Sequence, residues 1–152
     1  MHQWRNDNIG RFLNLAIQRF EKRVLALMEQ AGHGGFTLSH MAITRNLDVG
    51  GTRATEIARR AGITKQSVGE SIGQLEAMGL VERLPDPGDK RARTVQFTAA
   101  GMAWLEAFGA ALSQAEEEMR AELGDPAFAL IRQGLARYGS AEASLKEPSR
   151  TP

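Results

Sequence analysis

The segment GTRATEIARRAGITKQSVG, residues 51–69, decides which fold this chain is expected to adopt. Ala58 is small, as two closely crossing helices require. Gly62 follows four residues later, where a tight turn needs a positive φ, and Val68 comes six residues after that, beneath the second helix. This spacing is typical of a helix-turn-helix, although a helical hairpin inside an ordinary core has a similar glycine.

Helical periodicity continues on both sides of this segment, and a change of pattern after Gly79 indicates a hairpin. Thr37 and Thr64 are suitable N-caps, and Asp125-Pro126 is typical of a helix start. The turn PDPGDK separates two short strand candidates. The predicted elements are helices 8–31, 38–47, 53–61 and 65–78, strands 80–84 and 93–97, and helices 99–123 and 125–138.

The hairpin tip carries the cations Lys90, Arg91 and Arg93. A hairpin that only packs against a core does not need such a cluster, whereas a hairpin beside a helix-turn-helix forms the wing of a winged helix. The sequence thus predicts a mainly α protein with a small β-hairpin wing, of the α+β class. Its function is expected to be DNA binding, and the alternative is a winged helix that binds another protein without touching DNA.

Several linked motifs resemble MarR-family transcription regulators. They are the segment 51–69, LEAMGLVER at 75–83, DPGDKRA at 86–92 and FTAAG at 97–101. The resemblance implies a homodimer on a palindromic double-stranded DNA operator, a repressor role, and often control by a small aromatic ligand. The implied organisation is a winged helix-turn-helix lobe at 36–98 with dimerisation helices at 8–35 and 99–139. The segment 140–152 is rich in Ser, Glu, Lys and Pro, so a disordered tail is expected there.

The helix predicted at 65–78 is the expected recognition helix, because this helix enters the major groove and contacts base edges. Thr64 would cap it beside a phosphate. Gln66 can bond adenine through both amide atoms, and Glu70 can either accept from cytosine or restrain its neighbours. Many family members carry arginine at the position of Glu70. The residues expected on the outer face are Lys65, Gln66, Ser67, Glu70, Ser71 and Gln74, the last three being equally consistent with solvated surface.

In the wing, the resemblance assigns Arg91 to the minor groove and Asp89 to holding the wing arginines in place. Lys90 and Arg93 are expected to contact phosphates, which orient a protein without specifying sequence. Ahead of the helix-turn-helix, Thr52 and Arg53 are further candidates for contact with the DNA backbone.

An aromatic pocket for an effector is a further possibility, and core packing is its alternative. The residues that could line it are Phe12, Phe20, His40, Trp104 and Phe108. His2, His33 and His40 are too scattered to form a recognisable metal site. No metal and no cofactor are therefore expected.

Composition excludes other classes of function. The chain has 152 residues, 42% of them hydrophobic, a formal net charge of +1 and no cysteine. Thiol catalysis, thiol redox sensing and disulfides are thus excluded. Paired catalytic carboxylates, a phosphate-binding glycine loop and a nucleophile elbow are missing, so an enzyme is not expected. With no run of ~20 apolar residues and no apolar signal segment after Met1, the expected location is the cytoplasm, away from any membrane.

Overall fold

The computed structural model describes residues 2–145, with side chains described to residue 140. The chain divides into two compact units, one up to residue 112 and one from residue 113 onward. Its elements are η1 (Gln3–Arg5), α1 (Ile9–Gln30), α2 (Leu38–Arg45), α3 (Ala54–Ala61), α4 (Lys65–Ala77), β1 (Val81–Asp86), β2 (Asp89–Phe97), α5 (Ala99–Leu123) and α6 (Asp125–Leu145). This order confirms the predicted fold class.

Helices α2 and α4 begin where the predicted capping residues place them, and α1 has a similar cap. Asn8 caps α1 by accepting from the backbone N–H of Arg11 at 2.9 Å. Thr37 caps α2 and Thr64 caps α4, each through its side-chain oxygen. These bonds satisfy backbone donors that a helix leaves unpaired at its first turn.

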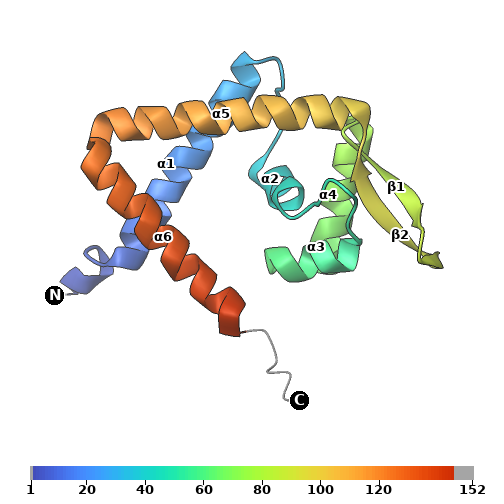
Figure 1. Ribbon diagram of the computed structural model, residues 1–152, viewed down its shortest axis with the longest axis horizontal. Helices are drawn as coiled ribbons and strands as arrows, with labels where there is room; N and C mark the ends of the chain where they lie inside the picture. Colours follow the sequence, from blue (N-terminus) through green and yellow to red (C-terminus); the bar gives the residue numbers. More distant parts are fainter. Residues whose placement is uncertain (1, 146–152) are drawn as a thin grey trace. The chain divides into compact units, whose positions relative to one another are not determined.

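The turn of the helix-turn-helix lies at Gly62, which has a φ of 66° and ends α3 in the left-handed conformation. An added Cβ would be strained by this backbone angle even though the space beside it is open. Figure 1 shows α2, α3 and α4 gathered beside the β1–β2 hairpin. The predicted role of this glycine is confirmed.

The hairpin is longer and its turn is tighter than the sequence predicted. Strands β1 and β2 pair antiparallel from Val81↔Phe97 to Asp86↔Asp89, with an irregularity between Pro85 and Asp86. The predicted broad turn at 85–90 is therefore wrong, since pairing continues almost to the tip. One cause is local, because the carboxylate of Asp86 accepts from the backbone N–H of Gly88 at 2.8 Å.

The core of the first unit lies beneath the helix-turn-helix and the hairpin. Its fully buried side chains include Met28, Met41, Ile43, Ile57, Val68, Ile72, Leu75, Val95 and Trp104. The first turn of α5 packs closely on this core, because a Cβ added at Gly101 would overlap the carbonyl oxygen of Leu80. A glycine is thus needed where α5 meets the end of the helix-turn-helix.

In the second unit, α6 begins at Asp125 and is helical to Leu145. The sequence predicted an end of this helix near residue 138, which is too early. The predicted disorder from residue 140 onward stays a prediction, and residues 146–152 lie outside the described residues. Phe128 is buried, and the guanidinium of Arg120 lies 5.0 Å from the centre of its ring. Within residues 2–145, no helix combines the length and apolar character that a membrane crossing requires.

Candidate nucleic-acid interface

The first turn of α4 is capped and open to solvent. Thr64 Oγ1 accepts from the backbone N–H of Ser67 at 3.1 Å and donates to Ser67 Oγ at 2.9 Å. Lys65, Gln66 and Ser67 are exposed. The positive end of the helix dipole and the side chains of this turn are therefore accessible to an anion.

One predicted restraint on the outer face of α4 is present. Gln66 donates through Nε2 to Glu70 Oε1 at 3.3 Å, and both residues are exposed. Glu70 thus restrains the amide of Gln66 from one helical turn away through the nitrogen of that amide.

Two residues assigned to this outer face have different roles. Ser71 is only 7% exposed, because it shares the core-facing side of α4 with Val68 and Leu75. Gln74 is exposed, but its Oε1 lies 2.6 Å from Nε2 of His40 in α2. The placement of Ser71 on the outer face was therefore wrong, and Gln74 already has a partner within the protein.

The tip of the wing presents its cations to solvent. The side chains of Lys90, Arg91 and Arg93 are exposed. Asp89 accepts from the backbone N–H of Arg91 at 3.0 Å, so it shapes the turn through the main chain. Asp89 therefore holds the main chain of one wing arginine, and its predicted role of keeping the wing arginines in place stays a prediction.

The acid that does bind an arginine here is Asp86, which the sequence reading missed. Arg53 donates from Nε to Asp86 Oδ2 at 2.7 Å. The pKa of Asp86 is lowered, first by the backbone N–H of Gly88 and then by Arg53. This pair joins the residue before α3 to the wing. Because Arg53 is also a predicted phosphate contact, the bond to Asp86 occupies one of the donors that Arg53 could offer to a phosphate.

Thr52 has a structural role within the lobe. It is 6% exposed, and its hydroxyl accepts from the backbone N–H of Asp48 at 2.9 Å. Its backbone exchanges two hydrogen bonds with Val95, at 3.0 and 2.9 Å, which adds a short bridge beside β2. A tertiary pairing thus buries Thr52 and leaves little of it accessible, and its contact with DNA stays a prediction.

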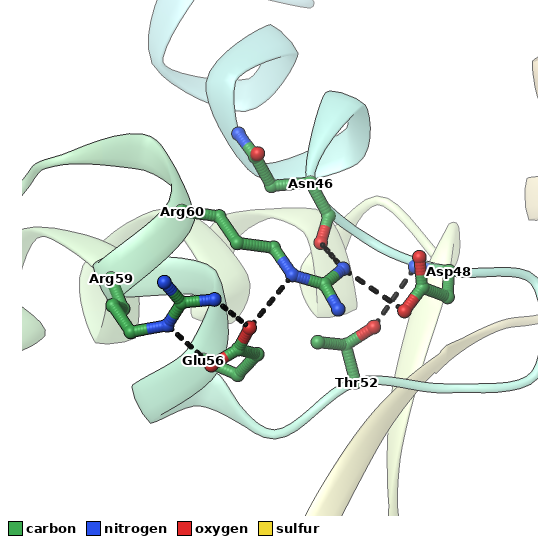
Figure 2. A network of polar contacts seen from close by, with 6 residues as sticks. All are labelled: Asn46, Asp48, Thr52, Glu56, Arg59 and Arg60. Atoms are coloured by element: carbon green, nitrogen blue, oxygen red, sulfur yellow. Dashed lines mark hydrogen bonds and ion pairs between the residues drawn. The ribbon is translucent and has the colours of Figure 1, made fainter. Parts of the chain in front are cut away.

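Figure 2 shows a polar network that ties α3 to the loop before it. Arg60 donates from Nη1 to Asp48 Oδ2 at 2.9 Å and to the carbonyl of Asn46 at 3.3 Å. Its Nε donates to Glu56 Oε1 at 2.9 Å. Arg60 thereby links the C-terminal end of α2, the loop and α3.

Glu56 is the anionic centre of this network (Figure 2). Arg59 donates to both of its carboxylate oxygens, at 2.8 and 2.6 Å. Hydrogen bonds from Arg59 and then from Arg60 lower the pKa of Glu56 from 4.5 to about 2. The sequence reading missed this cluster, although Glu-x-x-Arg-Arg spacing places both arginines one helical turn from the acid.

Three of the predicted pocket residues gather around Phe36, which the sequence reading missed. The ring of Phe36 lies 4.4 Å from Trp104 and 5.5 Å from His40, and Trp104 stacks on Phe108 at 5.0 Å. Trp104 is 1% exposed, and its indole N–H has no hydrogen-bond partner among the described residues. We call Phe36, His40, Trp104 and Phe108 the aromatic cluster.

The two other predicted pocket residues lie on α1. Phe12 is 50% exposed, and Phe20 is partly buried. Within the described residues, neither ring makes an aromatic contact with the cluster. The predicted set of five is therefore only partly brought together in this chain.

Comparison with known proteins identifies relatives of this fold. A sequence model described as "MarR family" matches residues 34–92, and no curated protein matches. A probable transcriptional regulator from Pseudomonas aeruginosa is 28% identical, with a TM-score of 0.68 over 88% of this chain and 98% of that one.

Two further structures share the fold at lower identity. Wild-type MarR from E. coli, in its apo form, is 19% identical, with a TM-score of 0.73 over 87% of this chain and 97% of that one. The transcriptional repressor CouR, bound to a 23-mer DNA duplex, is 22% identical, with a TM-score of 0.71 over 91% of this chain and 97% of that one.

Proposed function

From the match of residues 34–92 to a family model described as "MarR family", we propose that the protein belongs to this family and is a DNA-binding transcription regulator. In finer terms it is a repressor that binds a palindromic operator as a homodimer. The observation that carries the proposal is the pairing, in one lobe, of an open, capped N-terminus on α4 with an exposed cationic tip at Lys90, Arg91 and Arg93. A recognition helix and a wing need these two features to bind base edges and phosphates.

Four of the residues predicted on the outer face of α4 are exposed and fit a recognition helix. They are Lys65, Gln66, Ser67 and Glu70, and Thr64 caps the helix. In the wing, Arg91 fits the minor groove, where arginine responds to groove width and potential. Arg53 remains half-exposed beside its ion pair and contributes a phosphate contact.

Unpartnered apolar side chains support the dimer. The large hydrophobic residues exposed on α1 are Ile9, Phe12, Leu13, Leu15 and Ile17, and those on α6 are Leu130, Ile131, Leu135 and Tyr138. A stable monomer rarely leaves such sets in water, so each of these helices is expected to be covered by a second copy. Light scattering at micromolar concentration tests this assignment, and a monomer that still binds operator would contradict it.

The effector we propose is a small aromatic acid, recognised beside the aromatic cluster. Phe36 belongs both to the cluster and to an open groove that also contains Lys22 and His33. A flat ring can stack on the aromatic side chain, and Lys22 can pair with a carboxylate. Calorimetry with salicylate-like compounds tests this, and by linkage ligand and operator must weaken each other by the same factor.

The MarR family consists of transcription regulators and not of enzymes, which agrees with the sequence prediction. We place the protein in the cytoplasm, where its DNA would be found. The competing function is a winged helix that binds only protein. An exposed cationic tip is not needed for that role.

The decisive experiment is selection of bound duplexes from a random DNA library, followed by mobility shifts across a salt series. We expect one enriched palindromic sequence and an affinity that falls steeply with salt, because bound cations displace counterions. The Lys90→Ala/Arg91→Ala/Arg93→Ala variant should lose most binding. Arg132→Ala, which removes an exposed cation on α6, is the matched control. No enrichment and no salt dependence would support the protein-binding alternative.

A further inference from the structure

The ring of His40 has both nitrogens engaged inside the protein. Thr37 donates its backbone N–H to Nδ1 at 3.1 Å, and the backbone N–H of His40 returns a bond to Thr37 Oγ1 at 3.3 Å. Because Nδ1 accepts, it carries no proton. The proton of the neutral ring is therefore on Nε2, which donates to Gln74 Oε1 at 2.6 Å.

This arrangement joins three parts of the first unit. His40 is 4% exposed on α2, its ring lies 5.5 Å from Phe36 in the aromatic cluster, and its Nε2–H holds a residue of α4. The bond to Gln74 spans 34 positions of sequence. The bond from the Thr37 N–H to Nδ1 fixes the orientation of the imidazole ring. The direction of Nε2–H therefore does not depend on Gln74.

The same bond limits what Gln74 can offer to another molecule. Its amide oxygen accepts from His40, so one of the two lone pairs of this oxygen is occupied and the amide plane is held by a partner inside the protein. Adenine recognition by glutamine uses the oxygen and the nitrogen together. Gln74 is thus not free to turn its amide toward a base for that two-bond contact while His40 holds it.

We propose that His40 is a positioning residue for DNA recognition, which sets the orientation of α4 through Gln74. The proposal rests on the proposed function, with α4 as the recognition helix. Small displacements of a recognition helix shift every base contact at once, whereas phosphate contacts made by flexible cations tolerate them. Loss of the bond should therefore reduce preference for the operator more than affinity for DNA in general.

Three variants separate the two bonds of His40. His40→Asn keeps an acceptor near the position of Nδ1 but is too short to reach Gln74. His40→Gln can retain both bonds, because glutamine ordinarily fills this position of a capping box and its amide also carries a donor. Gln74→Met keeps the length of the side chain at position 74 and removes the oxygen that accepts from His40 Nε2–H.

Affinity is measured on the duplex that wild-type protein selects from a random library and on a scrambled duplex of equal composition. We expect His40→Asn and Gln74→Met each to bind the selected duplex about five-fold more weakly, as loss of one hydrogen bond implies. His40→Gln should stay within about two-fold of wild type, on the same bond-energy scale. Binding to the scrambled duplex and the salt slope should not change, because no charge is removed.

A double-mutant cycle tests whether the two residues act as one unit. The His40→Asn/Gln74→Met variant should bind the selected duplex no more weakly than either single variant, because the second change removes a bond already lost. If the losses multiply instead, Gln74 contacts DNA independently of His40 and the inference is wrong. Thermal unfolding of every variant accompanies the cycle, and a fall in Tm with no loss of operator preference would also overturn it.

The bond has a readout that does not involve DNA. Two-bond ¹H–¹⁵N correlation spectra of the free protein should show the Nε2–H tautomer in wild type, with a shifted Nε2–H signal in Gln74→Met. Wild-type protein that enriches no DNA sequence would overturn the proposed function and this inference together. An enriched sequence that all the variants bind as wild type does would overturn the inference alone.

Discussion

Arg53 Nε donates a 2.7 Å hydrogen bond to Asp86 Oδ2, and this pair connects the N-cap of α3 to the end of β1. The two residues are 33 positions apart in sequence. Asp86 also accepts from the backbone N–H of Gly88, so one carboxylate orders the turn of the wing and attaches its base to the helix-turn-helix. The direction in which the wing leaves the lobe therefore depends on this side chain.

Asp86→Asn should loosen the wing without unfolding the lobe. Asparagine can still accept from Gly88, but it loses the charge that attracts Arg53. We expect faster amide hydrogen exchange across residues 87–92 and weaker binding of both selected and scrambled duplexes, since the wing carries phosphate contacts. Glu82→Gln, the same chemical change at an exposed position of β1, is the control. Equal exchange in both variants would show that Asp86 does not restrain the wing.

Arg91→Ala and Gln66→Ala should impair DNA binding in different ways. Removal of Arg91 should weaken binding to any duplex and reduce the slope of log affinity against log salt by about 0.9, because one fewer cation displaces counterions. Removal of Gln66 should leave the slope unchanged and lower discrimination at one base pair per half-site by ~1–3 kcal/mol. Fluorescence anisotropy across a salt series measures both. An unchanged slope in Arg91→Ala would mean that the tip does not touch DNA.

Glu56 should make stability dependent on pH in the acid range. Its pKa is 4.5 without its partners and about 2 in the folded chain. Because the folded-state pKa is the lower one, the stabilisation is fully present above pH 4.5 and is lost as the pH falls toward 2. The Tm difference between wild type and Glu56→Gln should therefore shrink across that interval.

Arg59→Gln is the matched variant for this prediction. It removes the largest cause of the lowered pKa of Glu56, so stability should be lost at a higher pH than in wild type. Thermal unfolding followed by circular dichroism at a series of pH values measures both curves. If Glu56→Gln differed from wild type by a constant Tm from pH 5 to 2, the carboxylate would not be responsible.

Two glycine-to-alanine changes should have opposite effects on stability. A Cβ added at Gly73, inside α4, meets nothing within 4 Å, so alanine should raise the free energy of unfolding by up to about 1 kcal/mol through helix propensity. Gly62 has a φ of 66°, and alanine at this position should lower the free energy of unfolding by about 1–2 kcal/mol. Urea denaturation measures both values. A stabilised Gly62→Ala would contradict the assignment of the turn.

The local features of this protein follow from its sequence alone. Thr37 and Thr64 cap helices, and Gly62 turns the chain, as their types and spacing predict. Capping bonds and backbone angles involve residues within three or four positions of one another, so a short stretch contains all the information that they need. The cationic residues of the wing tip are identified for the same reason, because a two-stranded hairpin brings neighbours in sequence together.

Tertiary structure alone decided which of the polar residues predicted to contact DNA remain accessible to it. Ser71 faces the core, Thr52 pairs with Val95, and Gln74 is held by His40. The role of Phe36 at the centre of the aromatic cluster was equally hidden. Each of these outcomes depends on partners that lie tens of residues away or on the face that a helix turns toward the core. Sequence periodicity can mark a polar residue as available for binding, but only packing shows whether another part of the chain already holds it.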